Sequence, residues 1–114
     1  MHELGIVVHV MKIVEEVGEE NQLTDVKSVT CEIGEVSGVV PEYLTDCWQY
    51  ARRKSSLLQN SDLKIEIMPG ITYCENCGDT YETVPCGKIC PYCGSPDTYL
   101  VQGNGFQIKE IEGA

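Results

Sequence analysis

Four of the seven cysteines form two Cys-x-x-Cys pairs, a spacing typical of a tetrahedral metal site. The pairs are Cys74 with Cys77 and Cys90 with Cys93, and twelve residues separate them. Four thiolates from two such pairs can occupy the corners of one tetrahedron, which is the geometry of structural Zn²⁺ sites. A glycine follows each pair, where a tight turn favours a positive φ. Since four sulfur ligands leave no position for water or substrate, we expect a structural zinc.

Two other uses of these cysteines stay open at the level of sequence. The pairs could form two disulfides, or they could hold a rubredoxin-type iron in a redox module. An odd total of seven cysteines, four of them explained by a metal, indicates a reducing compartment and argues against disulfides. The twelve-residue gap is short for the iron centre. A colourless purified protein with about one zinc per chain would exclude the iron.

The three remaining cysteines have no assigned chemistry. Cys86 lies within the same segment and could exchange with a ligand, but we expect it to be a spare because only Cys90 and Cys93 carry the turn signature. Cys31 and Cys47 fall on faces predicted to be buried, where a free cysteine behaves as a small hydrophobic residue.

The amino-terminal Met1-His2-Glu3 is a second candidate metal site. The α-amine, the amide nitrogen of His2 and its imidazole can close adjacent chelate rings around one ion. The fourth donor could be the amide nitrogen or the carboxylate of Glu3. Such nitrogen-rich, square-planar surroundings select Ni(II) or Cu(II). A histidine near a terminus is usually an ordinary exposed side chain. This motif therefore supports a metal site only in combination with the other motifs of the chain.

The charge balance disfavours a nucleic-acid-binding role. The net charge is −10, with 18 acidic against 8 basic residues. Nucleic-acid affinity comes largely from basic residues that neutralise phosphates, so a transcription-type ribbon adaptor is disfavoured, and salt-sensitive nucleic-acid binding would revive it. We find no secretory signature and no stretch as long as a membrane span, and we expect a cytoplasmic protein.

Periodicity predicts the elements that position these sites. Apolar residues recur at helical spacing through residues 3–20. We expect this stripe to pack against a sheet; it consists of Leu4, Val7, Val8, Met11, Val14 and Val17 and is broadened by Ile6, Val10 and Ile13. Alternation predicts strands around residues 29–33 and 63–67, with a helix between them that begins at Pro41. A last strand follows over residues 106–111.

The order of elements predicts an α+β fold with an inserted zinc ribbon. A strand–helix–strand unit implies two parallel strands, and the last strand can pair antiparallel with them. We expect a small three-stranded mixed sheet with two helices on one face. Residues 1–69 and 104–114 would form this nickel-binding α/β domain, and residues 70–103 would form the zinc-ribbon domain. The ribbon offers few large apolar residues, so it is expected to unfold without its ion.

Three features together resemble the HypA/HybF family, the nickel-incorporation accessory proteins of [NiFe] hydrogenase. They are Met1-His2-Glu3 opening a helix, the segment Ile-Gly-Glu-Val-Ser-Gly-Val at residues 33–39, and the late four-cysteine ribbon. The resemblance covers the whole chain.

The resemblance implies a metallochaperone that is not an enzyme. Its nickel ligands would centre on His2, with the amine of Met1 and the backbone or side chain of Glu3. The four ribbon cysteines match the zinc ligands of the family. The implied partners are a HypB-type GTPase and the hydrogenase large subunit, and some members also serve urease maturation. No phosphate-binding loop is visible in the sequence, so GTP hydrolysis would belong to the partner.

Overall fold

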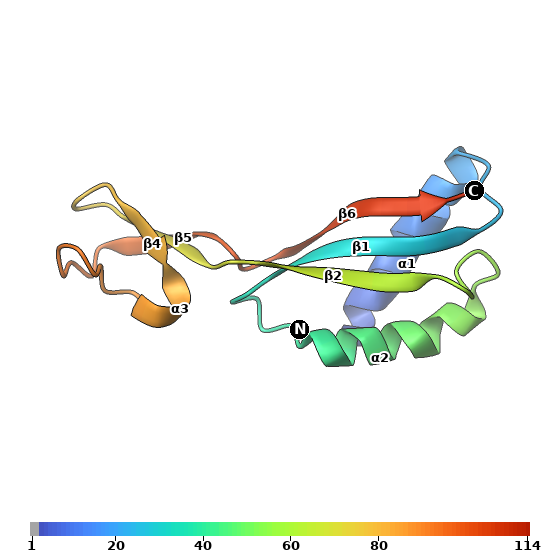
Figure 1. The fold of residues 1–114 in the computed structure, drawn as a ribbon, viewed down its shortest axis with the longest axis horizontal. Coiled ribbons are helices and arrows are strands. Elements are labelled where there is room, and N and C mark those ends of the chain that lie inside the picture. The colour runs from blue at the N-terminus through green and yellow to red at the C-terminus, as the bar shows by residue number, and fades with distance from the viewer. Residues whose placement is uncertain (1–2) are drawn as a thin grey trace. The chain divides into compact units, whose positions relative to one another are not determined.

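The computed structural model describes residues 3–114, which divide into two compact units (Figure 1). The α+β unit comprises residues 3–32, 39–66 and 107–114, and the ribbon unit comprises residues 33–38 and 67–106. Within residues 3–114, no helix combines the length and the apolar character that a bilayer crossing requires.

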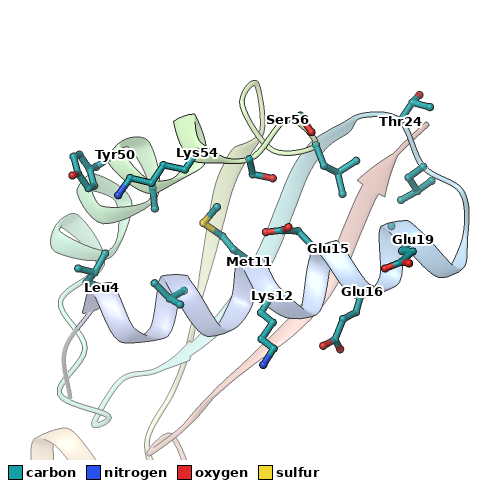
Figure 2. A pocket seen from close by; sticks show the side chains of 16 residues that line it. Leu4, Met11, Lys12, Glu15, Glu16, Glu19, Thr24, Tyr50, Lys54 and Ser56 are labelled. Atoms are coloured by element: carbon teal, nitrogen blue, oxygen red, sulfur yellow. The ribbon is translucent and has the colours of Figure 1, made fainter.

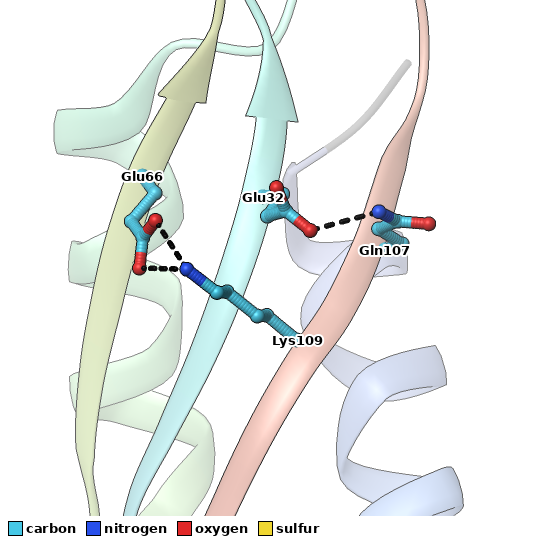
Figure 3. Close-up of polar contacts among 4 residues, drawn as sticks. All are labelled: Glu32, Glu66, Gln107 and Lys109. Atoms are coloured by element: carbon cyan, nitrogen blue, oxygen red, sulfur yellow. Dashed lines mark hydrogen bonds and ion pairs between the residues drawn. The ribbon is translucent and has the colours of Figure 1, made fainter.

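The α+β unit contains the predicted mixed sheet with two helices. The helices are α1 (Glu3–Glu20) and α2 (Pro41–Ala51), and α2 continues into the short 3-10 helix η1 (Arg52–Lys54). The sheet has the order β2-β1-β6, with bounds β1 Val26–Gly34, β2 Asp62–Met68 and β6 Phe106–Gly113. Figure 3 shows β1 and β2 running in the same direction and both helices behind the sheet. The predicted fold class is therefore confirmed.

The buried face of α1 is only a part of the broad apolar stripe that the sequence suggested. The buried apolar side chains are those of Ile6, Val7, Val10, Met11 and Val14. The arc of apolar residues on this helix is wider than the face that α2 and the sheet cover. Two members of the predicted stripe therefore lie outside the core: Leu4 is 47% exposed and Val8 is 56% exposed.

Trp48 anchors α2 in the core of this unit. Its side chain is 1% exposed, and its Nε1 donates a hydrogen bond of 2.9 Å to the carbonyl of Ser61. Nη1 of Arg52 donates to the same carbonyl, also at 2.9 Å. A buried indole N–H needs an acceptor, and the carbonyl of Ser61 supplies it. The two bonds together connect the end of α2 to the residue that precedes β2.

The two cysteines of the α+β unit lie at different depths. Cys31 is buried as predicted, and burial raises the pKa of its thiol to about 11, so it stays protonated and unreactive at neutral pH. Cys47, predicted to be buried, is half-buried.

Polar side chains bridge the strands on the face of the sheet away from the helices (Figure 3). Nζ of Lys109 on β6 reaches across β1 to both carboxylate oxygens of Glu66 on β2, at 2.9 and 3.1 Å. This carboxylate raises the pKa of Lys109. Gln107 donates to Glu32 of β1 at 2.8 Å. The outer face of the sheet is thus held by polar contacts between all three strands.

The ribbon unit contains a second three-stranded sheet that the sequence did not predict. Its strands are β3 (Ile71–Cys74), β4 (Thr80–Glu82) and β5 (Thr98–Gln102), in the antiparallel order β4-β3-β5, and the short helix α3 (Thr83–Cys86) follows β4. Tyr73 pairs with Thr80 on one side and with Tyr99 on the other. Strands of three to five residues are too short to give a clear alternation.

Three glycines, Gly34, Gly70 and Gly103, allow backbone segments within the ribbon unit to approach each other closely. A Cβ on Gly34 would overlap the carbonyl of Gly103. Gly103 itself has a φ of +106°, and a Cβ there would lie 2.6 Å from the Cα of Gly70. A side chain at Gly103 is therefore excluded both by the backbone conformation and by space.

Candidate metal centre

Two equivalent turns present the four cysteines of the ribbon unit. In each turn the glycine after the second cysteine donates its N–H to the carbonyl of the first: Gly78 to Cys74 at 2.9 Å, and Gly94 to Cys90 at 2.8 Å. The φ values of these glycines are +78° and +76°, in the region that favours glycine. The sequence signature thus corresponds to two matching knuckles.

The four sulfur atoms converge on one point. The Sγ atoms of Cys74 and Cys93 are 3.6 Å apart, and those of Cys77 and Cys90 are 3.7 Å apart. All four Sγ atoms lie within 4.8 Å of one another. A tetrahedral ion with Zn–S bonds of ~2.3 Å requires S–S distances of ~3.8 Å. The two Sγ pairs at 3.6 and 3.7 Å therefore match the spacing of a tetrahedral four-thiolate site.

The environment shifts the pKa values of the Cys77 and Cys93 thiols in opposite directions. The side-chain amide of Asn76, at 3.5 Å from Sγ, and the backbone N–H of Ser95 lower the pKa of Cys93 to about 6. For Cys77 the backbone N–H of Asp79 lowers the pKa, but burial and the neighbouring thiols outweigh it and raise the pKa to about 12. Neighbouring thiolates repel each other, so full ionisation of the cluster requires a bound cation.

The thiols also form the interior of the ribbon unit. Cys74 and Cys90 are buried together with Tyr81, and Cys86 packs against this group. The hydroxyl of Tyr81 donates to the carbonyl of Gly87 at 2.9 Å. Cys86 is half-buried and is not a member of the converging four-sulfur group.

One contributor to the site was missed at the level of sequence. Asn76 lies between the first two cysteines, and its side chain donates to the sulfur of Cys93 in the other pair. It therefore links the two knuckles. The sequence did contain a signal for this contact. An asparagine within a Cys-x-x-Cys turn carries an amide donor that can reach a thiolate of the facing turn.

The predicted nickel ligands fall at the edge of the described residues. Met1 and His2 lie outside residues 3–114, and Glu3 is the first residue of α1. Oε2 of Glu3 accepts a hydrogen bond of 3.1 Å from the N–H of Val40, the residue immediately before α2. Val40 has no side-chain cap of its own, and a carboxylate at a helix N-terminus is favoured by the helix dipole. The Glu3 side chain thus joins the start of α1 to the start of α2.

The fold and the cysteine cluster together define a class of protein. The class is that of small α+β proteins with a four-cysteine, metal-binding ribbon. Comparison with known proteins then gives the family. Residues 1–113 match the family described as "Hydrogenase/urease nickel incorporation, metallochaperone, hypA". The chain belongs to this HypA family.

Curated relatives agree with the family over nearly the whole chain. The chain is 32% identical over 115 residues to the hydrogenase maturation factor HypA of Albidiferax ferrireducens, with 98% of each chain covered. It is 35% identical over 112 residues to the protein of the same name from Geobacter metallireducens, again with 98% of each chain covered. The protein is accordingly a maturation factor and not an enzyme.

Solved structures share the fold. The solution structure of the Ni metallochaperone HypA from Helicobacter pylori aligns with a TM-score of 0.75 at 23% identity, over 99% of this chain and 97% of that chain. A second solution structure of a HypA protein gives a TM-score of 0.78, also at 23% identity, over 100% of this chain and 97% of that chain. The α+β arrangement with its ribbon is therefore the fold of these structures.

Proposed function

We propose that this nickel metallochaperone of hydrogenase maturation binds Ni(II) at its amino terminus. The donors are the α-amine of Met1, the amide nitrogen and imidazole of His2, and one group of Glu3. The observation that carries the proposal is the family match over residues 1–113, which include Met1, His2 and Glu3. The donor chemistry fits, since nitrogen-rich square-planar surroundings select Ni(II) or Cu(II) over other divalent ions.

The contact of Glu3 supports its amide nitrogen, rather than its carboxylate, as the fourth donor. The carboxylate accepts the hydrogen bond from Val40 at the start of α2. Moving it to an ion would remove this bond and leave the first turn of α2 without its capping acceptor. The backbone nitrogen is adjacent to the His2 donors and can extend the chelate without that loss.

Zinc in the ribbon has a structural role in this proposal. Cys74, Cys77, Cys90 and Cys93 are the proposed ligands, since their sulfur spacing fits a closed tetrahedral Zn(II) site. Residues 70–103 would act as the zinc-ribbon domain, and residues 1–69 with 104–114 as the nickel-binding domain. Metal analysis that finds iron in place of zinc would overturn this assignment.

The partners follow from the proposed delivery of nickel. The proposed partners are a HypB-type GTPase and the hydrogenase large subunit. Urease maturation proteins are further proposed partners. The family description names both hydrogenase and urease. We propose a cytoplasmic location, because an odd number of seven cysteines, four of them proposed metal ligands, indicates a reducing compartment. The net charge of −10 disfavours a nucleic-acid partner.

Nickel titration of three matched chains tests the proposal. The chains are the native protein, His2→Ala, and a chain with residues fused ahead of Met1. Both changes should abolish stoichiometric nickel binding, because they remove the imidazole or the α-amine. Zinc content and the circular dichroism spectrum should stay unchanged. Stoichiometric nickel in both altered chains would refute the amino-terminal chelate.

A further inference from the structure

An open groove of about 1040 Å³ runs along α1 in the α+β unit (Figure 2). One wall is α1, and the other is formed by the end of α2, by η1 and by the loop of residues 55–57. Figure 2 shows Met11 and Glu15 pointing from α1 toward the opposite wall, whereas Lys12 and Glu16 point outward. From Leu4 to Glu19 the groove follows α1 for roughly 22 Å, at 1.5 Å per residue.

One end of this groove exposes large apolar side chains. Leu4, Val8 and Tyr50 line it and are 47%, 56% and 59% exposed. Eight residues of α1 line the groove, and five of them, Leu4, Val8, Met11, Glu15 and Gly18, follow successive spacings of four, three, four and three. This is the heptad spacing of a seam that packs against a second helix. Met11 and Gly18 are themselves buried and form the floor of this row. Leu4 and Val8 are also the two members of the predicted apolar stripe that the fold leaves exposed.

The other end of the groove is acidic. Glu15, Glu16 and Glu19 line the half toward the C-terminus of α1, and the last turn of that helix has no basic residue. The carbonyl end of a helix adds partial negative charge at the same place. The basic residues lie elsewhere in the groove: Lys12 comes earlier on α1, and Nζ of Lys54 lies 4.9 Å from the ring centroid of Tyr50. The groove therefore changes from apolar to negative along its length.

We propose that this groove binds an amphipathic α-helix of a partner protein, with an apolar stripe over Leu4 and Val8 and lysine or arginine residues over Glu15 and Glu19. The heptad spacing favours a helix as the occupant, and the charge of the groove selects a basic one. A second copy of this chain is disfavoured because two chains of charge −10 repel each other. The inference goes beyond the proposed nickel site, since it uses none of the donors of Met1 or His2.

A synthetic helical peptide tests this docking surface. The probe is about 16 residues long, to match the groove, with leucines at alternating four- and three-residue spacing and three lysines in its last turns. We expect it to shift the amide resonances of α1 and of residues 50–57, with an affinity that falls as salt rises. A second peptide with glutamates in place of the lysines should bind at least about tenfold more weakly.

Matched substitutions separate the apolar and acidic contributions. Val8→Asp should weaken the lysine peptide about tenfold or more, whereas Val84→Asp, at a 60% exposed position of the ribbon unit, should change the affinity less than about twofold. Glu15→Lys with Glu19→Lys should weaken it similarly, and Glu110→Lys on β6 should not. The near-ultraviolet circular dichroism of Trp48 reports whether each variant is folded.

Three results would overturn the proposal. The first is the absence of shifts at the groove with millimolar lysine peptide. The second is equal binding of the lysine and glutamate peptides. The third is self-association of the native chain that Val8→Asp abolishes, because it would make the groove an interface between two copies.

Discussion

Removal of the ribbon metal should open the ribbon unit and leave the α+β unit folded. The buried group of the ribbon is Cys74, Tyr81 and Cys90, so two of its three members are proposed ligands. Burial of Tyr81 contributes about 1.5–3 kcal/mol at most. Metal binding contributes on the order of 10–16 kcal/mol in comparable zinc peptides. Because the second quantity exceeds the first several-fold, the ribbon depends on its ion, whereas the α+β unit has its own core around Trp48.

Amide hydrogen exchange resolves the two units in one experiment. After chelation under reducing conditions, or in Cys74→Ser, we expect the amides of residues 71–102 to lose their protection. Protection of α1 and β1 should persist. Trp48, the only tryptophan of the chain, lies in the α+β unit, so its emission should stay at the native wavelength. Ribbon amides that stay protected without metal, or a Trp48 signal that changes in step with them, would refute the reasoning.

Three further predictions follow from single residues. Gly103→Ala should lower the free energy of unfolding by about 2–4 kcal/mol in chemical denaturation, because the positive φ and the backbone of Gly70 exclude a side chain. The control Gly105→Ala, with open space around it, should change this free energy by less than about 1 kcal/mol. Equal effects of the two substitutions would contradict this explanation. Cys86→Ser should retain about one zinc per chain by metal analysis, and loss of the zinc would make Cys86 a ligand. The pKa of Cys31 is raised from 9.0 to about 11, so the unfolded state loses this proton first and stability should fall as pH rises from 9 to 11; Cys31→Ala should show a smaller fall, and identical pH profiles would contradict the assignment.

The sequence predicted the elements that have a long hydrophobic periodicity and the cysteine site that has a characteristic residue spacing. Helix α1 runs over Glu3–Glu20 as its periodicity indicated, and the two Cys-x-x-Cys-Gly turns have the expected geometry. The short strands of the ribbon unit were missed, because their register depends on pairing within the unit rather than on local pattern.

Tertiary contacts decided the remaining features. An apolar arc shows that part of a helix is buried, but only packing partners decide that Ile6 lies inside while Leu4 and Val8 stay exposed. The bond between Glu3 and Val40 joins residues 37 positions apart, and no local pattern indicates it. The groove is likewise a product of how α1 and α2 pack.

We expect nickel to bind nitrogen donors at the amino terminus and not the sulfur atoms of the ribbon. X-ray absorption at the nickel edge distinguishes these two sets of donors, in a native chain that contains zinc and one equivalent of Ni(II). We predict a first shell of nitrogen donors with imidazole scattering and no sulfur, and loss of that signal in His2→Ala. A nickel–sulfur shell in the native chain would contradict this expectation.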